Sequence, residues 1–183
     1  PQKDGLTIKY NAAGVPQWTK TFNGVGDNTD KPKAMAIDAS GNTFVAGSAV
    51  EYGNDNNFAL QKIDATGATT WVKTINGTSV ESSDATEAVI TDATGSIYVA
   101  GYIHNKGFAS DITIAKYDTN GNQIWVNSYD YITESDRAVA IGLDSSNNVY
   151  VTGRSDSDAS LVSNDDIITL KYSNAGFVQW ATR

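Results

Sequence analysis

One phrase occurs four times along the chain, and this repeat constrains the fold more than any other feature of the sequence. Each copy holds an apolar run with a lysine, a glycine five residues after that lysine, and a tryptophan four residues after the glycine. The tryptophans Trp18, Trp71, Trp125 and Trp180 are 53, 54 and 55 residues apart. Self-similarity at a fixed period of this length is typical of solenoids, propellers and arrays of repeats.

A second phrase alternates with the first. It consists of an alanine-rich or apolar run, a short Asp/Asn/Gly turn and a second apolar run, at 33–47, 87–101 and 137–153. Each phrase is typical of a β-hairpin, and no useful helical periodicity is present. Four antiparallel strands per period predict an all-β chain built as a portion of a β-propeller, about 3.5 blades long. The expected units are a half-blade at 6–21 and blades at 33–74, 87–129 and 137–182.

The run from Asp136 to Gly153 resembles the seven-bladed β-propeller repeat (SBBP-type) family of bacterial surface and secreted proteins. The resemblance lies in Ala138-Val139-Ala140-Ile141, in Asp144, in Val149-Tyr150-Val151-Thr152-Gly153 and in the Lys-Tyr and Gly-to-Trp phrase that follows. It extends over essentially the whole chain. The resemblance implies the propeller fold and an extracellular or bacterial cell-surface location, and it brings no common catalytic residues.

The number of expected blades leaves two interpretations open. Closed propellers have roughly four to eight blades, so three and a half blades cannot close a ring. Either the sequence is a portion of a longer chain, which we favour, or copies of the chain associate as a homo-oligomer that completes a ring.

Composition excludes several classes of function. The chain has no cysteine, so disulfides and thiolate metal sites are absent. The net charge of -8 argues against nucleic acid, and no apolar run is long enough for membrane insertion. With one histidine, His104, and no Gly-x-Ser-x-Gly turn, we expect no enzyme. His104 is expected to be an exposed loop residue, and a glycan-active enzyme using chance carboxylate pairs is a weaker alternative.

The long loops are the expected functional region. If the strands of a blade run outward in order, the long, divergent loops at 22–32, 49–57, 75–86, 102–110, 129–136 and 154–165 share one end of the blades. They carry twelve of the 21 acidic residues: Asp27, Asp30, Glu51, Asp55, Glu81, Asp84, Asp130, Glu134, Asp136, Asp156, Asp158 and Asp165. The sequence therefore predicts a non-catalytic binding or scaffold module that presents an acidic, Tyr/Asn/Asp-rich face to a protein or a glycan. The candidate ligand-binding residues are Tyr52, Asp55, Tyr102, His104, Tyr131 and Asp156.

Three alternatives accompany this prediction. Acidic loops often do no more than solvate turns, which would make the chain a structural spacer or a self-assembling propeller unit. No cofactor is expected, but calcium is an alternative with Asp27, Asp30, Asp156 and Asp158 as candidate ligands. The repeated residues are expected to be structural: the tryptophans pack between blades, and Lys9, Lys62, Lys116 and Lys171 pair with acids of adjacent blades.

Overall fold

The computed structural model is an array of antiparallel sheets without helices in the part of the chain that it describes, residues 4–22, 29–50, 56–79, 83–106, 109–131, 135–156 and 165–183. The strands are β1 (Gly5–Tyr10), β2 (Pro16–Phe22), β3 (Lys31–Ile37), β4 (Thr43–Val50), β5 (Asn56–Ile63), β6 (Thr69–Ile75), β7 (Ala85–Thr91), β8 (Ile97–Lys106), β9 (Ala109–Tyr117), β10 (Gln123–Tyr129), β11 (Asp136–Leu143), β12 (Val149–Asp156), β13 (Asp165–Tyr172) and β14 (Val178–Thr182).

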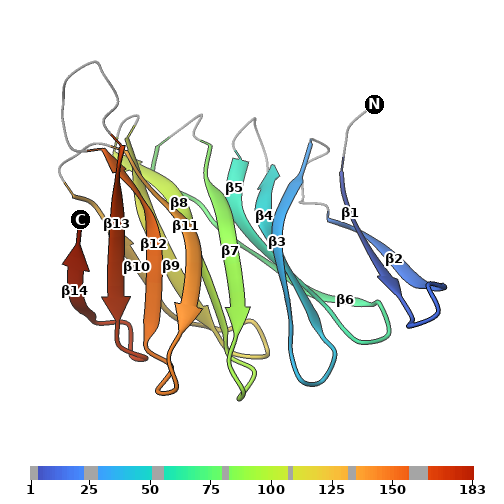
Figure 1. Ribbon diagram of the computed structural model, residues 1–183. Coiled ribbons are helices and arrows are strands. Elements are labelled where there is room, and N and C mark those ends of the chain that lie inside the picture. Colours follow the sequence, from blue (N-terminus) through green and yellow to red (C-terminus); the bar gives the residue numbers. More distant parts are fainter. Residues whose placement is uncertain are drawn as a thin grey trace.

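The strands form one two-stranded sheet and three four-stranded sheets in sequence order. We name them the half-blade (β1–β2), blade 1 (β3–β6), blade 2 (β7–β10) and blade 3 (β11–β14). Figure 1 shows these sheets side by side, with the first strands β3, β7 and β11 next to one another and the hairpin turns together at the lower end. The described chain thus has a partial, propeller-like all-β fold, as the repeat predicts. No helix in the described part is long and apolar enough to cross a bilayer.

The hairpin turns are fixed by a repeated aspartate. Asp38 Oδ1 accepts the backbone N–H groups of Ser40 and Asn42, each at 2.9 Å, and Gly41 follows with φ 80°. A positive φ favours glycine because it has no Cβ, and asparagine tolerates it, as Asn147 does with φ 58° in the turn of blade 3. Equivalent aspartates hold four other turns, namely Asp64, Asp92, Asp118 and Asp144, and Asn11 and Ser173 take this position in the turns of the half-blade and of the last hairpin.

The first strand of each blade lies very close to the second. A Cβ added to Gly101 on β8 would lie 2.0 Å from the carbonyl oxygen of Ala85 on β7, and Gly47 and Gly153 are in the same position in blades 1 and 3. A β-bulge follows at once in each first strand, for example between Thr86 and Ala88. The repeated glycine of the second strand therefore permits the close approach of two backbones.

The core consists of layers between successive blades. Tyr98 and Ile112 of blade 2 pack with Val151, Leu170 and other residues of blade 3 in one cluster, and Phe44 and Phe58 of blade 1 pack with blade 2 in another. Every residue of β4 is buried, so this second strand is covered on both faces. Blades therefore share their cores with their neighbours, as in other repeat proteins.

The tryptophans of the half-blade, blade 1 and blade 2 each pack against a turn glycine of the next blade. A Cβ added to Gly67, Gly121 or Gly176 would lie within 3.0 Å of Trp18, Trp71 or Trp125, respectively. Trp71 and Trp125 also donate Nε1–H to the carbonyls of Thr119 and Asn174 in those turns, at 3.4 and 3.1 Å. The prediction that these three tryptophans pack between blades is confirmed.

The repeated lysines do not pair as predicted. Lys9 and Lys62 donate to the backbone carbonyls of Ala65 and Thr119 in the next blade's turn, at 3.3 and 2.7 Å, and Lys116 donates to the side chain of Asn174. Among these four lysines, in the described part of the chain, Lys171 lies within ion-pair distance of an aspartate, at 3.7 Å, and that aspartate, Asp144, belongs to its own blade. The turn carbonyls are within reach of the lysines of the preceding blade. The turn aspartates already accept hydrogen bonds from the backbone N–H groups of their own turns, for example from Thr66 to Asp64 and from Asn120 to Asp118.

Candidate functional site

The ends of the blades opposite the hairpin turns carry the predicted site residues, and we call this region the loop end. Tyr52, Asp55, Asp27 and Asp158 lie outside the described residues. The remaining candidates do not form one exposed cluster. Tyr102 and His104 lie on β8, Asp156 ends β12, Asp30 precedes β3, and Tyr131 follows β10. Of these, Asp30 and His104 are buried, whereas Tyr131 is exposed.

Three of the acids expected on an exposed acidic face are buried, and this corrects the prediction for them. Asp30, Asp84 and Asp136 occupy the same position in the three blades, eight residues before the turn aspartate. Asp30 accepts the N–H of Val50 at 2.8 Å, and Asp136 accepts the N–H of Tyr131 at 2.8 Å. Buried carboxylates satisfy backbone donors where strands end, so these groups hold the loop end together from inside. Burial also raises the pKa of the Asp136 carboxyl above its ordinary value.

Asp84 contacts three nitrogen donors with its two oxygens. Its Oδ1 accepts the backbone N–H of His104 at 2.9 Å and lies 3.0 Å from the His104 ring Nδ1, while its Oδ2 accepts the N–H of Gly77 at 2.8 Å. A carboxylate can only accept, so Nδ1 carries the proton in this contact. The prediction that His104 is an exposed loop residue is wrong: β8 continues through it, and its ring is bound to a buried acid.

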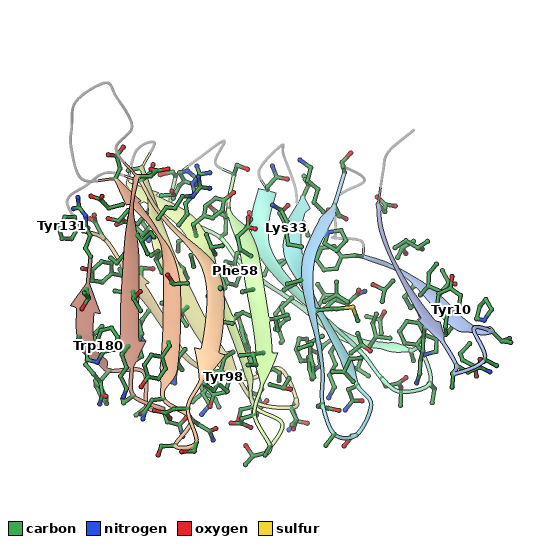
Figure 2. The ribbon with its side chains drawn as sticks, viewed as in Figure 1. Tyr10, Lys33, Phe58, Tyr98, Tyr131 and Trp180 are labelled. Atoms are coloured by element: carbon green, nitrogen blue, oxygen red, sulfur yellow. The ribbon has the colours of Figure 1, made fainter. Side chains whose placement is uncertain are left out.

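Cationic side chains line the described part of the loop end. A hollow of about 290 Å³ is lined by Lys33, Glu87, Tyr102, Ala138, Val139, Arg137 and Arg154. Lys33 of blade 1 pairs with Glu87 of blade 2 at 3.2 Å, and the guanidinium of Arg137 lies over the Tyr102 ring, 4.5 Å from its centroid. Figure 2 shows Lys33 near the loop end of β3. In this hollow, positive side chains therefore lie beside Glu87, and the described surface is mixed in charge. Six of the twelve acids expected in the loops lie outside the described residues: Asp27, Glu51, Asp55, Glu81, Glu134 and Asp158.

Two arginines dominate this hollow. Arg137 on β11 and Arg154 on β12 are directly opposite each other in the strand register. Like charges directly opposite on neighbouring strands destabilise a sheet unless an anion lies between or beside them. Arg154 has such a neighbour in Asp165, at 3.5 Å, but both side chains of this ion pair are exposed. Exposed pairs of this kind contribute little and exchange partners readily.

A second hollow of about 270 Å³ adjoins the first and shares both arginines. It is lined by Ser135, Arg137, Arg154, Asp156 and Asp165. Asp156, a predicted ligand residue, lines this hollow, and Tyr102, another, lines the first. The two hollows share these arginines as lining residues, and we call the pair of hollows together the arginine hollow.

Tyr131 lies apart from the arginine hollow and does not line it. The guanidinium of Arg183 covers its ring at 4.7 Å, and Arg183 Nε donates to Asp166 at 3.0 Å. Tyr102 and Tyr131 thus each have a guanidinium over one face of the ring. On that face of each ring, the guanidinium occupies the position in which a carbohydrate ring would stack.

Metal binding finds no support in the described residues. No group of three or more His, Asp or Glu side chains there is close enough to hold a metal ion. Asp30, a candidate calcium ligand, is instead buried and bound to the backbone of Val50. Asp156 lines the arginine hollow with Arg137 and Arg154, and the other two candidate calcium ligands, Asp27 and Asp158, lie outside the described residues.

Comparison with known proteins supports the fold alone. No family model matches the chain, and no curated protein matches it, so the resemblance to seven-bladed propeller repeats stays a prediction. Among solved structures, the chain is similar to a protein of unknown function from Bacteroides caccae, with a TM-score of 0.58 and 10% sequence identity. The match covers 100% of this chain and 58% of that one. The chain therefore spans 58% of the length of the solved structure that it matches.

Proposed function

We propose that the protein is a non-catalytic binding module that recognises an acidic segment of a protein partner at the arginine hollow. The observation that carries this proposal is the facing pair of Arg137 and Arg154, in a hollow that Tyr102 and Ser135 also line. A carboxylate between the two guanidinium groups would relieve their repulsion and accept hydrogen bonds from both. Arginine and tyrosine are also enriched among the residues that dominate protein interfaces.

The stacking of Arg137 on Tyr102 supports the proposal because it orients the guanidinium before a ligand binds. The guanidinium is held over the ring at 4.5 Å, and its Nε donates to Ser110 Oγ at 3.2 Å. Because it is already oriented, Arg137 loses little side-chain entropy when a ligand binds. Arg154 is exposed and free to turn from Asp165 toward an incoming carboxylate.

A non-catalytic role agrees with the place of the one histidine in the chain. His104 is buried, and both its ring Nδ1 and its backbone N–H contact the Asp84 carboxylate near the end of β8. The proposal also includes an extracellular or cell-surface location, which depends on the resemblance of the repeats to those of surface and secreted proteins.

Selection of peptides from a displayed random library on the immobilised protein tests the proposed function. We expect enriched peptides to carry Asp or Glu, and their affinity to fall at least about tenfold in Arg154→Glu, through loss of one charged contact and gain of repulsion. Lys20→Glu on β2 is the matched control, because it makes the same charge change outside the arginine hollow. Peptides that bind Arg154→Glu as well as the unaltered chain would contradict the proposal. Enrichment on a glycan array that depends on Arg154 would instead favour a glycan ligand.

A further inference from the structure

The two parts of the arginine hollow differ in charge. Among the described residues, the larger part is lined by three cationic side chains, Lys33, Arg137 and Arg154, and by one acidic side chain, Glu87. We call it the Lys33 hollow. The smaller part has the same two arginines but also two aspartates, so its described charges balance. In a chain with a net charge of -8, the Lys33 hollow is thus a local surplus of positive charge, which attracts a ligand with more than one negative charge.

The cationic groups of the Lys33 hollow belong to blades on two sides of Glu87. Lys33 is on β3, Glu87 is on β7, and the two arginines are on β11 and β12. Figure 1 shows β7 between β3 and β11, and β7 contacts both of these strands. A compact dianion such as a phosphate group would have to lie against the Glu87 carboxylate to reach both sides. Two carboxylates on neighbouring residues of a ligand can instead occupy one side each.

The residues that line the Lys33 hollow differ from blade to blade, unlike the residues that build the fold. Lys33, Glu87 and Val139 take the same position in the three blades, each fourteen residues before the glycine of the second strand. Tyr102 and Arg154 both follow that glycine directly, where blade 1 has a serine. The turn aspartates and the glycines of the second strands recur, whereas a position that is cationic, acidic and aliphatic in turn is not fixed by the fold. Such variation on a rigid scaffold is typical of binding residues.

Lys33 has the capacity to bind a second acceptor where it stands. Its Nζ lies 3.2 and 3.3 Å from the two carboxylate oxygens of Glu87, and its side chain is 45% exposed. An ammonium group has three N–H donors, so a ligand carboxylate can take the solvent-facing side of the group while the Glu87 contact is kept. The ion pair with Glu87 of the next blade holds the ammonium group at the hollow before a ligand binds.

We propose that the partner segment carries two neighbouring acidic residues, one bound by Arg137 and Arg154 and the other by Lys33. This inference rests on the proposed function and names what its ligand must contain. Lys33 is then a specificity-determining residue, because it distinguishes a segment with two acids from a segment with one. Since the Lys33 side chain is partly exposed to water, its contact with the second carboxylate contributes about threefold to affinity.

Fluorescence polarisation with three labelled peptides of equal length tests the second contact. One peptide has two glutamates separated by a glycine, and in each of the others one of these glutamates is replaced by glutamine. The unaltered chain should bind the diacidic peptide at least about threefold more tightly than either monoacidic peptide, and Lys33→Gln should bind all three equally. Lys20→Gln on β2 makes the same charge change outside the hollow and should keep the difference. A difference that persists in Lys33→Gln would overturn the proposal.

Arg154→Glu separates failure of this inference from failure of the proposed function. If all three peptides bind the unaltered chain equally and all lose affinity in Arg154→Glu, the proposed function stands and the contact with Lys33 is refuted. If no peptide binds, or if Arg154→Glu leaves binding unchanged, both are refuted. A fourth peptide carries one phosphoserine in place of the two glutamates. Tighter binding of this peptide than of the diacidic one, unchanged by Lys33→Gln, would also overturn the inference, because one compact dianion at the arginines would then suffice.

Discussion

The buried carboxylate of Asp84 is predicted to be a major contributor to stability, and Asp84→Ala tests this. The substitution leaves the backbone N–H groups of His104 and Gly77 and the ring Nδ1 of His104 without their acceptor. A hydrogen bond to a charged group contributes roughly 1.5–3 kcal/mol to stability. Removing the buried carboxylate also removes its desolvation cost, which offsets part of the lost hydrogen-bond energy. We therefore expect a loss of about 4 kcal/mol in the free energy of unfolding, a large share of the roughly 5–15 kcal/mol of a typical domain.

Two companion variants separate the hydrogen bonds from charge. Asp84→Asn keeps one oxygen for His104 but turns an amide toward the N–H of Gly77, so we expect it to lose about 2 kcal/mol. Asp165→Ala removes an exposed acid of the same loop end and should change stability by less than about 0.5 kcal/mol. Urea unfolding followed by tryptophan fluorescence measures all three. A loss below about 1 kcal/mol in Asp84→Ala would refute the account of this carboxylate as an internal support.

Three further predictions concern the repeat. In urea unfolding, Gly101→Ala should lower the free energy of unfolding by about 3 kcal/mol, because the added Cβ would lie 2.0 Å from the Ala85 carbonyl oxygen. Gly142→Ala, whose added Cβ has no atom within 4 Å, should be neutral or slightly stabilising. Equal effects of the two substitutions would contradict the role of the close backbone approach. Trp125→Ala should lower the free energy of unfolding by about 3 kcal/mol, because it leaves a cavity where the ring packs against Gly176. Ile124 is an exposed residue of the same strand, and Ile124→Ala should lower it by less than about 1 kcal/mol on the same measurement. Hydrogen bonds from Asn122 and Asn148 lower the pKa values of Asp118 and Asp144 below 3.8, so the stability these groups contribute is present above that pH and is lost as pH falls through their lower folded values. Urea midpoints between pH 7 and pH 2 that stay constant would contradict this last prediction.

The fold was predictable because its determinants recur at fixed spacing. The repeated Trp and Gly, as in Trp71 and Gly121, indicate a packing contact between blades. The repeated Asp and Gly, as in Asp38 and Gly41, indicate a hairpin turn. The covered second strands were equally readable, since a continuous apolar run needs cover on both faces. The partners of the lysines could not be predicted from the sequence, because they are mostly backbone carbonyl groups, which every residue has.

The loop end was harder to predict because charge alone does not show burial. Asp84 and Asp136 looked like members of an exposed acidic face, although their recurrence eight residues before a turn aspartate marks a structural position. The arginine hollow depends on strand register. The bulge between Ala138 and Ala140 shifts the pairing by one residue and places Arg154, instead of Ser155, opposite Arg137. Such a bulge has no signature in a single copy of the repeat.

The stability of Gly121→Ala tests most directly the central claim that tryptophan-on-glycine contacts hold successive blades together. A Cβ at position 121 would lie 3.0 Å from the Trp71 ring, whereas a Cβ at Gly14, in a turn with a similar positive φ, has no described atom within 4 Å. The account predicts that Gly121→Ala lowers the free energy of unfolding in urea by at least about 2 kcal/mol more than Gly14→Ala does. Equal losses in the two variants would contradict it.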